Sequence, residues 1–109
     1  MKAALDRTLA ALAEPSRRRI VDLLRERPRR AGELAEETGL TLPATSRHLK
    51  TLRDCGLVAA VNPEFDTRVR IYSLEPGAFA ALKSWLDDTE KLWATQLTAF
   101  KSHIERKKP

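Results

Sequence analysis

The stretch TLPATSRHLKTLRDCGLV, residues 41–58, decides the fold of this 109-residue chain. Thr41 is suited to cap a helix, and Pro43 fits the first helical turn. Leu49 and Leu52 then recur on one face, and Gly56 supplies a stop. The pattern predicts an amphipathic helix with an apolar inward face and a polar, basic outward face.

A second short helix is predicted just before this stretch. The run AGELAEET, residues 31–38, places Leu34 and Ala35 inward, and Gly39 favours the left-handed conformation that ends helices. Residues 39–41 leave room only for a tight turn. Two short helices joined in this way form a helix-turn-helix, here over about residues 31–55.

Two further helices are predicted at the N-terminal side. Residues 3–13 carry leucines at helical spacing, at positions 5, 9 and 12. Pro15 then opens a helix that runs to about Arg27, with Ile20, Val21 and Leu24 on its inward face.

A β-hairpin, which would form a wing over about residues 57–74, is predicted after Gly56. The segments LVAAV (57–61) and TRVRIYSL (67–74) are rich in β-branched residues, and the connector NPEFD favours a turn around residues 63–66. We expect Arg68 and Arg70 on the same face of a strand, where they would grip a phosphate or the minor groove.

A long final helix is predicted over about residues 76–105. Apolar side chains keep helical spacing through it, at Phe79, Leu82, Leu86, Trp93, Leu97, Phe100 and Ile104, and Trp85 and Leu92 widen the stripe. Such a rod is longer than a small domain needs, so part of the stripe would stay exposed in a monomer. The expected fold is mainly α with a small β-hairpin: a winged helix-turn-helix in a single domain, residues 1–109. A partner helix would cover the exposed part of the stripe, so we expect a dimer.

The composition favours a polyanionic partner. The chain holds 20 Lys and Arg against 15 Asp and Glu, a formal net charge of +5. Cys55 is the single cysteine, which excludes an internal disulfide and suits a reducing cytoplasm. No stretch has the pattern of a signal peptide or reaches the length of a transmembrane helix, so no membrane partner is expected.

The outward face of the helix predicted within residues 41–58 suits double-stranded DNA, because a helix fits the major groove and its side chains then meet base edges and phosphates. The basic hairpin strengthens this interpretation, since the helix pattern alone would also fit an ordinary solvated face. We expect base contacts mainly from residues 45–48 and backbone contacts from the rest. The expected DNA-binding residues are Thr41, Pro43, Thr45, Ser46, Arg47, His48, Lys50, Thr51, Arg53, Arg68 and Arg70.

The order of elements and three segments resemble the ArsR-type family of winged-helix repressors. These segments are ALAEPSRRRIVDLL (11–24), LPATSRHLKTLRDCGLV (42–58) and IYSL (71–74), and the step from Ser46 to Leu49 is the most specific part. The resemblance implies a symmetric dimer built from the first and last helices, with Ser46, Arg47 and His48 in its recognition helix. The expected interface residues are then Leu5, Leu9, Leu12, Trp85, Leu86, Trp93, Leu97 and Phe100. It also implies that the two recognition helices read an inverted repeat from successive major grooves, about 34 Å apart.

The metal sites typical of that family are missing. Aligned on Ser46, the Cys-x-Cys of the arsenic- and cadmium-type sites falls at Arg30 and Gly32, which offer no thiolate. The last helix offers only His103, followed by Glu105, in place of the zinc-type Asp-x-His and His-x-x-Glu pattern. We therefore expect no metal, no cofactor and a regulator that is not a metal sensor of these types.

The sequence argues against an enzyme and leaves two alternative functions open. The chain lacks a glycine-rich phosphate loop and a nucleophile with an identifiable base, so an enzyme is not expected. A protein-interaction module and a thiol-redox-responsive regulator are the alternatives. Cys55 is either a small packed apolar group or a redox-active thiol, which Arg53 would favour and Asp54 would oppose. The effector, the operator sequence and the choice between repression and activation are not fixed by these residues.

Overall fold

The corner at Glu14 separates the first two helices. In the computed structural model, which describes residues 2–66 and 68–106, α1 spans Lys2–Ala13 and α2 spans Pro15–Glu26. The Glu14 carboxylate accepts a hydrogen bond from the Arg17 backbone N at 3.0 Å, and Pro15 occupies the first turn of α2. Both helices were predicted, and α2 ends one residue before the expected Arg27.

The helix-turn-helix follows as predicted. The third helix, α3, spans Ala31–Thr38 and ends at Gly39, whose φ of 74° is in the left-handed region. The fourth, α4, spans Leu42–Asp54, and its cap is Thr41, whose Oγ1 accepts from Ala44 N at 3.2 Å. Gly39 and Thr41 therefore set the tight turn between the two helices.

The sheet contains one strand more than predicted. Strands β1 (Arg29–Arg30), β2 (Val58–Val61) and β3 (Ile71–Leu74) form an antiparallel sheet in the order β1-β3-β2. In the hairpin, Val58 is opposite Leu74 and Val61 is opposite Ile71. The two-residue β1 has no alternating pattern of its own, and only its pairing with β3 makes it a strand.

The wing has shorter strands and a longer loop than expected. Because β3 begins at Ile71, Arg68 and Arg70 precede it, and the prediction that they share a face of a strand is wrong. Inside the loop, Asn62 Nδ2 donates to Val69 O at 2.9 Å, which joins the two sides of the loop. Side-chain hydrogen bonding replaces regular strand pairing here.

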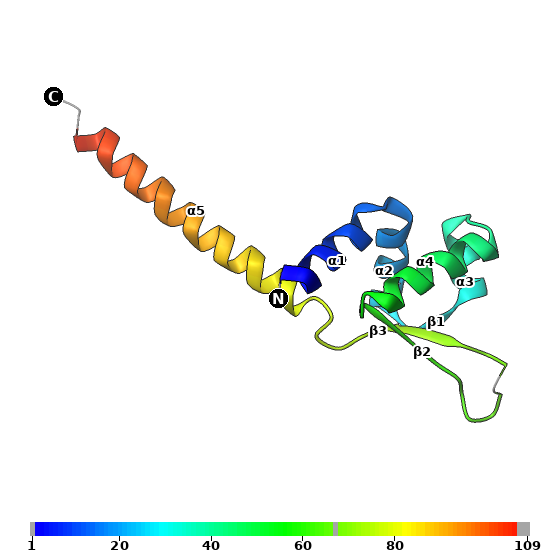
Figure 1. Cartoon of the computed structure of the whole chain (residues 1–109). Helices are drawn as coiled ribbons and strands as arrows, with labels where there is room; N and C mark the ends of the chain where they lie inside the picture. The colour runs from blue at the N-terminus through cyan, green and yellow to red at the C-terminus, as the bar shows by residue number, and fades with distance from the viewer. Residues whose placement is uncertain (1, 67, 107–109) are drawn as a thin grey trace.

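The last helix, α5, spans Ala80–Arg106 and begins four residues later than predicted. Gly77 has a φ of 72°, and Ala80 N donates to Gly77 O at 3.1 Å, so residues 76–79 form turns instead of a helical start. Beyond α1, α5 projects away from the rest of the chain (Figure 1), and the molecule measures 75 × 27 × 23 Å. None of the α5 residues is buried.

The core lies between α2, α3, α4 and the sheet. It is built from Ile20, Val21, Leu24, Leu34, Leu49, Leu52, Leu57, Val58 and Tyr72, with Ala11 from α1. On α1 the buried residues are Thr8 and Ala11, whereas Leu9 is 41% exposed. The leucine face of α1 is therefore turned partly away from the core.

No helix in the described part of the chain combines the length and the apolar character needed to cross a membrane.

Leu49→Ala should destabilise the fold by about 2–5 kcal/mol, because Leu49 is fully buried and its truncation leaves a cavity. Urea unfolding at fixed protein concentration measures the change. Leu42→Ala, the same truncation at a half-exposed site on the same helix, should cost about 0.5 kcal/mol or less. Equal losses in the two variants would contradict the orientation of α4.

Candidate nucleic-acid interface

The outward face of α4 presents polar and basic side chains on a fixed support. Ser46, Arg47 and Lys50 are exposed, while Leu49 and Leu52 are fully buried on the opposite side. Buried residues three apart fix the rotation of a helix about its axis, so the exposed set cannot turn inward without opening the core. The arrangement offers hydrogen-bond donors along a surface of the width that a major groove accepts.

Thr45 does not belong to that face, contrary to the expectation from sequence. It is fully buried, and its Oγ1 donates to the Thr41 backbone O at 2.9 Å. The position lies four residues before Leu49, so it shares the inward stripe of the helix. Thr45 supports the start of α4, and its hydroxyl is not presented to a base edge.

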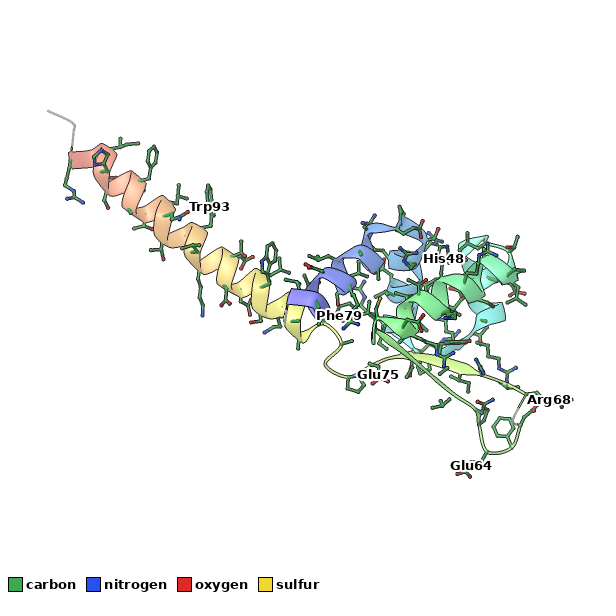
Figure 2. All side chains as sticks on the ribbon, in the orientation of Figure 1. His48, Glu64, Arg68, Glu75, Phe79 and Trp93 are labelled. Atoms are coloured by element: carbon green, nitrogen blue, oxygen red, sulfur yellow. The ribbon has the colours of Figure 1, made fainter. Side chains whose placement is uncertain are left out.

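His48 (labelled in Figure 2) is half-buried and contacts side chains of the protein itself, so its DNA contact stays a prediction that these contacts do not favour. Its Nε2 lies 3.8 Å from Glu14 Oε2, and its Nδ1 lies 3.5 Å from Arg17 Nη1. Only 22% of the side chain is exposed. The imidazole contacts the corner between α1 and α2.

In the second half of α4, some of the polar side chains already bond to other groups of the same helix. Lys50 Nζ pairs with Asp54 Oδ2 at 3.1 Å, and Thr51 Oγ1 donates to Arg47 O at 3.2 Å. Arg53 is exposed. Because the Lys50 pair is solvent-exposed, it adds little stability and a phosphate can replace the carboxylate.

The wing places its arginines in the loop before β3. Arg68 binds Asp66 through Nε at 3.2 Å and through its backbone N at 2.9 Å, and Arg70 is exposed. The side-chain hydrogen bond from Arg68 holds the pKa of Asp66 below its usual value, with further lowering by the Arg68 backbone N. The loop before β3 therefore carries the Arg68–Asp66 ion pair and the exposed Arg70.

Two exposed apolar residues at this surface were not predicted from sequence. Leu42, at the first turn of α4, is 52% exposed, and Phe65, at the wing tip, is 83% exposed. An apolar contact to a thymine methyl suits the first, and a contact to the minor groove suits the second. Their apolar character in segments that otherwise carry polar side chains was the available signal.

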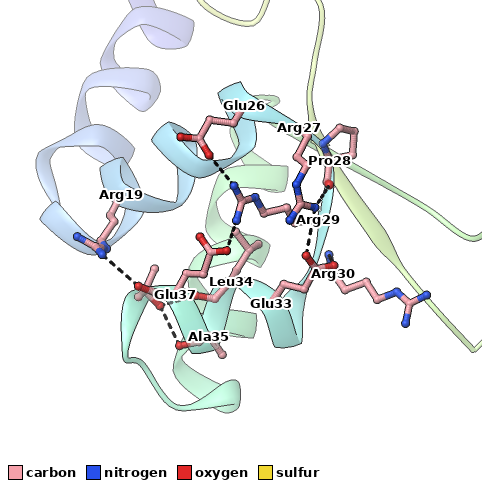
Figure 3. Close-up of polar contacts among 11 residues, drawn as sticks. Arg19, Glu26, Arg27, Pro28, Arg29, Arg30, Glu33, Leu34, Ala35 and Glu37 are labelled. Carbon is pink, nitrogen blue, oxygen red and sulfur yellow. Dashed lines mark hydrogen bonds and ion pairs between the residues drawn. The ribbon is translucent and has the colours of Figure 1, made fainter.

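An interior arginine holds the helix-turn-helix against α2 (Figure 3). Arg29 is 5% exposed, pairs with Glu26 at 2.6 Å and forms an ion pair with Glu37 of α3. Its Nε and Nη1 have no hydrogen-bond partner, although Nη1 takes part in the Glu37 ion pair. Nearby, the side-chain hydrogen bond from Arg27 lowers the pKa of Glu33, which lies in the first turn of α3.

Comparison with known proteins identifies the family. Residues 14–60 match the family model described as bacterial regulatory protein, arsR family. The HTH-type transcriptional regulator Rv2034 of Mycobacterium tuberculosis is 38% identical over 100 residues, which cover 92% of this chain and 88% of that protein. The chain belongs to the ArsR family. It is therefore a DNA-binding transcriptional regulator and not an enzyme.

Solved structures agree with the assignment. An ArsR-like transcriptional regulator from Rhodococcus sp. RHA1 has a TM-score of 0.77 and 27% identity, covering 93% of this chain and 92% of that one. The homodimeric winged helix-turn-helix DNA-binding domain of Mb0332 from Mycobacterium bovis has a TM-score of 0.61 and 28% identity, with 95% and 84% covered. The predicted winged helix-turn-helix fold is confirmed, with β1 as the added strand.

The residues of this ArsR-family chain do not fit a thiolate metal site at the start of α3. Arg30 and Gly32 supply no ligand atom there, and among residues 2–66 and 68–106 no three His, Cys, Asp or Glu side chains gather as a metal would require. Cys55 caps the end of α4 and packs, partly buried, against the core. This position matches the expectation of a small packed group, and the redox activity of Cys55 is still an open prediction.

Asp66→Asn should tighten binding to every duplex and steepen its salt dependence by about 0.9 in slope, because the released Arg68 would neutralise one more phosphate. Fluorescence anisotropy across a salt series measures the slope. Glu64→Gln removes the same charge from the wing without breaking the Arg68 pair. Identical slopes in the two variants would show that the Asp66 pair does not limit Arg68.

Proposed function

We propose that this ArsR-family chain represses transcription by binding an inverted-repeat operator as a homodimer. The proposal is carried by the outward face of α4, where Ser46, Arg47 and Lys50 are exposed above a buried leucine stripe. A recognition helix needs such a face, because base edges are read by side chains that stand on a rigid backbone.

The proposed DNA contacts are of two kinds, those to bases and those to phosphates. In this proposal Arg47 donates two hydrogen bonds to a guanine, and Ser46 bonds an adjacent base. Phosphate contacts, which position the protein without reading sequence, come from the remaining donors, of which all but the half-buried Thr51 are exposed. These are Thr41, Lys50, Thr51, Arg53, Arg68 and Arg70, with Pro43 at the first turn packing beside the backbone.

The dimer buries the apolar stripe of α5. Large side chains along it are 43% to 65% exposed, at Trp85, Leu86, Leu92, Trp93, Leu97, Phe100 and Ile104. Helix α1 lies beside the start of this helix (Figure 1), and its Leu9 is 41% exposed. A second copy would cover such a self-complementary surface with two-fold symmetry. The similar M. bovis domain is homodimeric. We therefore propose that Leu5, Leu9 and Leu12 form the dimer interface together with the α5 residues, as expected from the sequence.

The regulator acts as a single domain in the cytoplasm, and release from DNA does not use the metal sites typical of its family. Arg30 and Gly32 remove the ligands of one such site, and the last helix lacks the spacing of the other. A small molecule, thiol chemistry at Cys55 or a protein partner would then supply the signal.

Genomic-fragment selection with the purified protein tests the proposal, followed by anisotropy on the enriched duplex. Recovery of an inverted repeat bound at least about a thousandfold more tightly than random DNA supports it. Equal and weak binding to all duplexes would overturn it and favour a protein-interaction module. Transcription in vitro from a promoter carrying the repeat then separates repression from activation.

Arg47→Ala should cost about 1–3 kcal/mol of binding free energy on the selected duplex, because a bidentate base contact is lost. On random DNA the loss should be small. Arg25→Ala removes the same charge from α2, where Arg25 pairs with Asp22 at 3.2 Å, and should leave selectivity unchanged. An unchanged affinity for Arg47→Ala would remove Arg47 from the base contacts.

Trp93→Asp should convert the dimer to a monomer, because it places a charge at a large apolar contact. Sedimentation velocity at micromolar concentration measures the change. Thr95→Asp introduces the same charge two residues along α5, on another face of the helix, and should preserve the dimer. A dimer that survives Trp93→Asp would exclude Trp93 from the centre of the interface.

A further inference from the structure

Arg17 closes the end of α1. The helix ends at Ala13, so the carbonyls of its last turn lack helical donors. Arg17 Nε donates to Ala11 O at 2.7 Å, and Arg17 Nη2 donates to Ala10 O at 3.4 Å. A cation at this end of a helix is also favoured by the helix dipole. The Arg17 side chain, which starts on α2, thereby holds the last turn of α1.

The same guanidinium reaches the recognition helix. Arg17 Nη1 lies 3.5 Å from His48 Nδ1. Arginine has only donors, so Nδ1 must be the acceptor, and the proton of the neutral ring is then on Nε2. That nitrogen faces Glu14 Oε2 at 3.8 Å. Both sides of the imidazole are thus directed at the corner between α1 and α2.

Glu14 is fixed in turn. Desolvation raises its pKa, but hydrogen bonds from the backbone N atoms of Ser16 and Arg17, and the positive charge of Arg17, leave the pKa below its usual value. The carboxylate is therefore ionised at neutral pH. It is a constant acceptor beside His48 Nε2.

We propose that Arg17 and His48 form a tether that couples the end of α1 to the recognition helix, which makes His48 a positioning residue and not a base contact. The proposal rests on the proposed function, since it assigns a route by which the dimer surface controls the DNA surface. The tether joins the carbonyls of Ala10 and Ala11, next to the interface leucines of α1, to the middle of α4.

The coupling follows from where the contacts lie. His48 is at the border between the buried stripe of α4 and its exposed face, so a shift of the ring changes the position of Arg47 beside it. A ligand or partner that moves α1 at the dimer interface would change the tether and so the fit of α4 in the groove. The effector therefore does not need to touch the DNA-binding surface.

A double-mutant cycle tests the tether, with Arg17→Met, His48→Leu and the double variant assayed on the selected duplex. Each single change should weaken specific binding about fivefold, and the double variant should be no weaker than either, because both remove one interaction. Arg18→Met removes a neighbouring exposed charge from α2 and corrects for the lost cation. Additive losses, or a loss in His48→Leu without one in Arg17→Met, would overturn the proposal and indicate a direct DNA contact by His48.

A conservative replacement separates positioning from packing. The side-chain oxygen of His48→Asn occupies nearly the place of Nδ1 and can accept from Arg17, so this variant should recover most of the specific affinity. If Arg17→Met does not fold, Arg17→Lys keeps the charge but carries all its donors on one nitrogen, so it cannot reach together the acceptors that Arg17 contacts through Nε, Nη1 and Nη2, and it takes its place in the cycle. Affinity of His48→Asn as low as that of His48→Leu would contradict the tether.

Amide hydrogen exchange in the free protein tests the coupling between the end of α1 and α4 in the absence of DNA. His48→Leu should speed exchange at the end of α1, and Arg17→Met should speed it in α4 around residue 48. If the parent protein selects no repeat, the proposed function fails while exchange still tests the tether. If the parent is selective but each variant alters exchange only in its own helix, the tether alone fails.

Discussion

The buried stripe of α4 is the constraint on which the other features depend. Leu49 and Leu52 are fully buried against a core that α2, α3 and the sheet complete, and this contact sets the rotation of the recognition helix. Once the rotation is fixed, Ser46 and Arg47 face outward, Thr45 joins the core, and His48 is left at the border. The functional surface is therefore a consequence of apolar packing.

Polar contacts then fix how the helix-turn-helix sits on the rest of the chain. The buried Arg29 joins α2 to α3 through two carboxylates, and Arg17 joins the end of α1 to α4. Buried polar groups stabilise a fold weakly but restrict its geometry when they are paired. In an ArsR-family regulator, whose output depends on the placement of a recognition helix, such restriction matters more than net stability.

The two ends of the molecule also differ in the polarity of their surfaces. One end carries the basic face of α4 and the wing, and the other carries α5, with no buried residue of its own. A monomer leaves the second end exposed to water, so the proposed dimer and the proposed DNA contacts use different surfaces.

The sequence by itself determined the helix-turn-helix, the hairpin, the apolar rod and the family, because helix caps, glycine stops and apolar periodicity are local. It did not determine β1, the late start of α5 or the side on which Thr45 and His48 lie. Strand β1 exists only through pairing with β3, and the start of α5 follows from the left-handed Gly77. Thr45 and His48 lie beside outward residues in sequence, and only packing against α2 and its corner decides which polar side chains face inward.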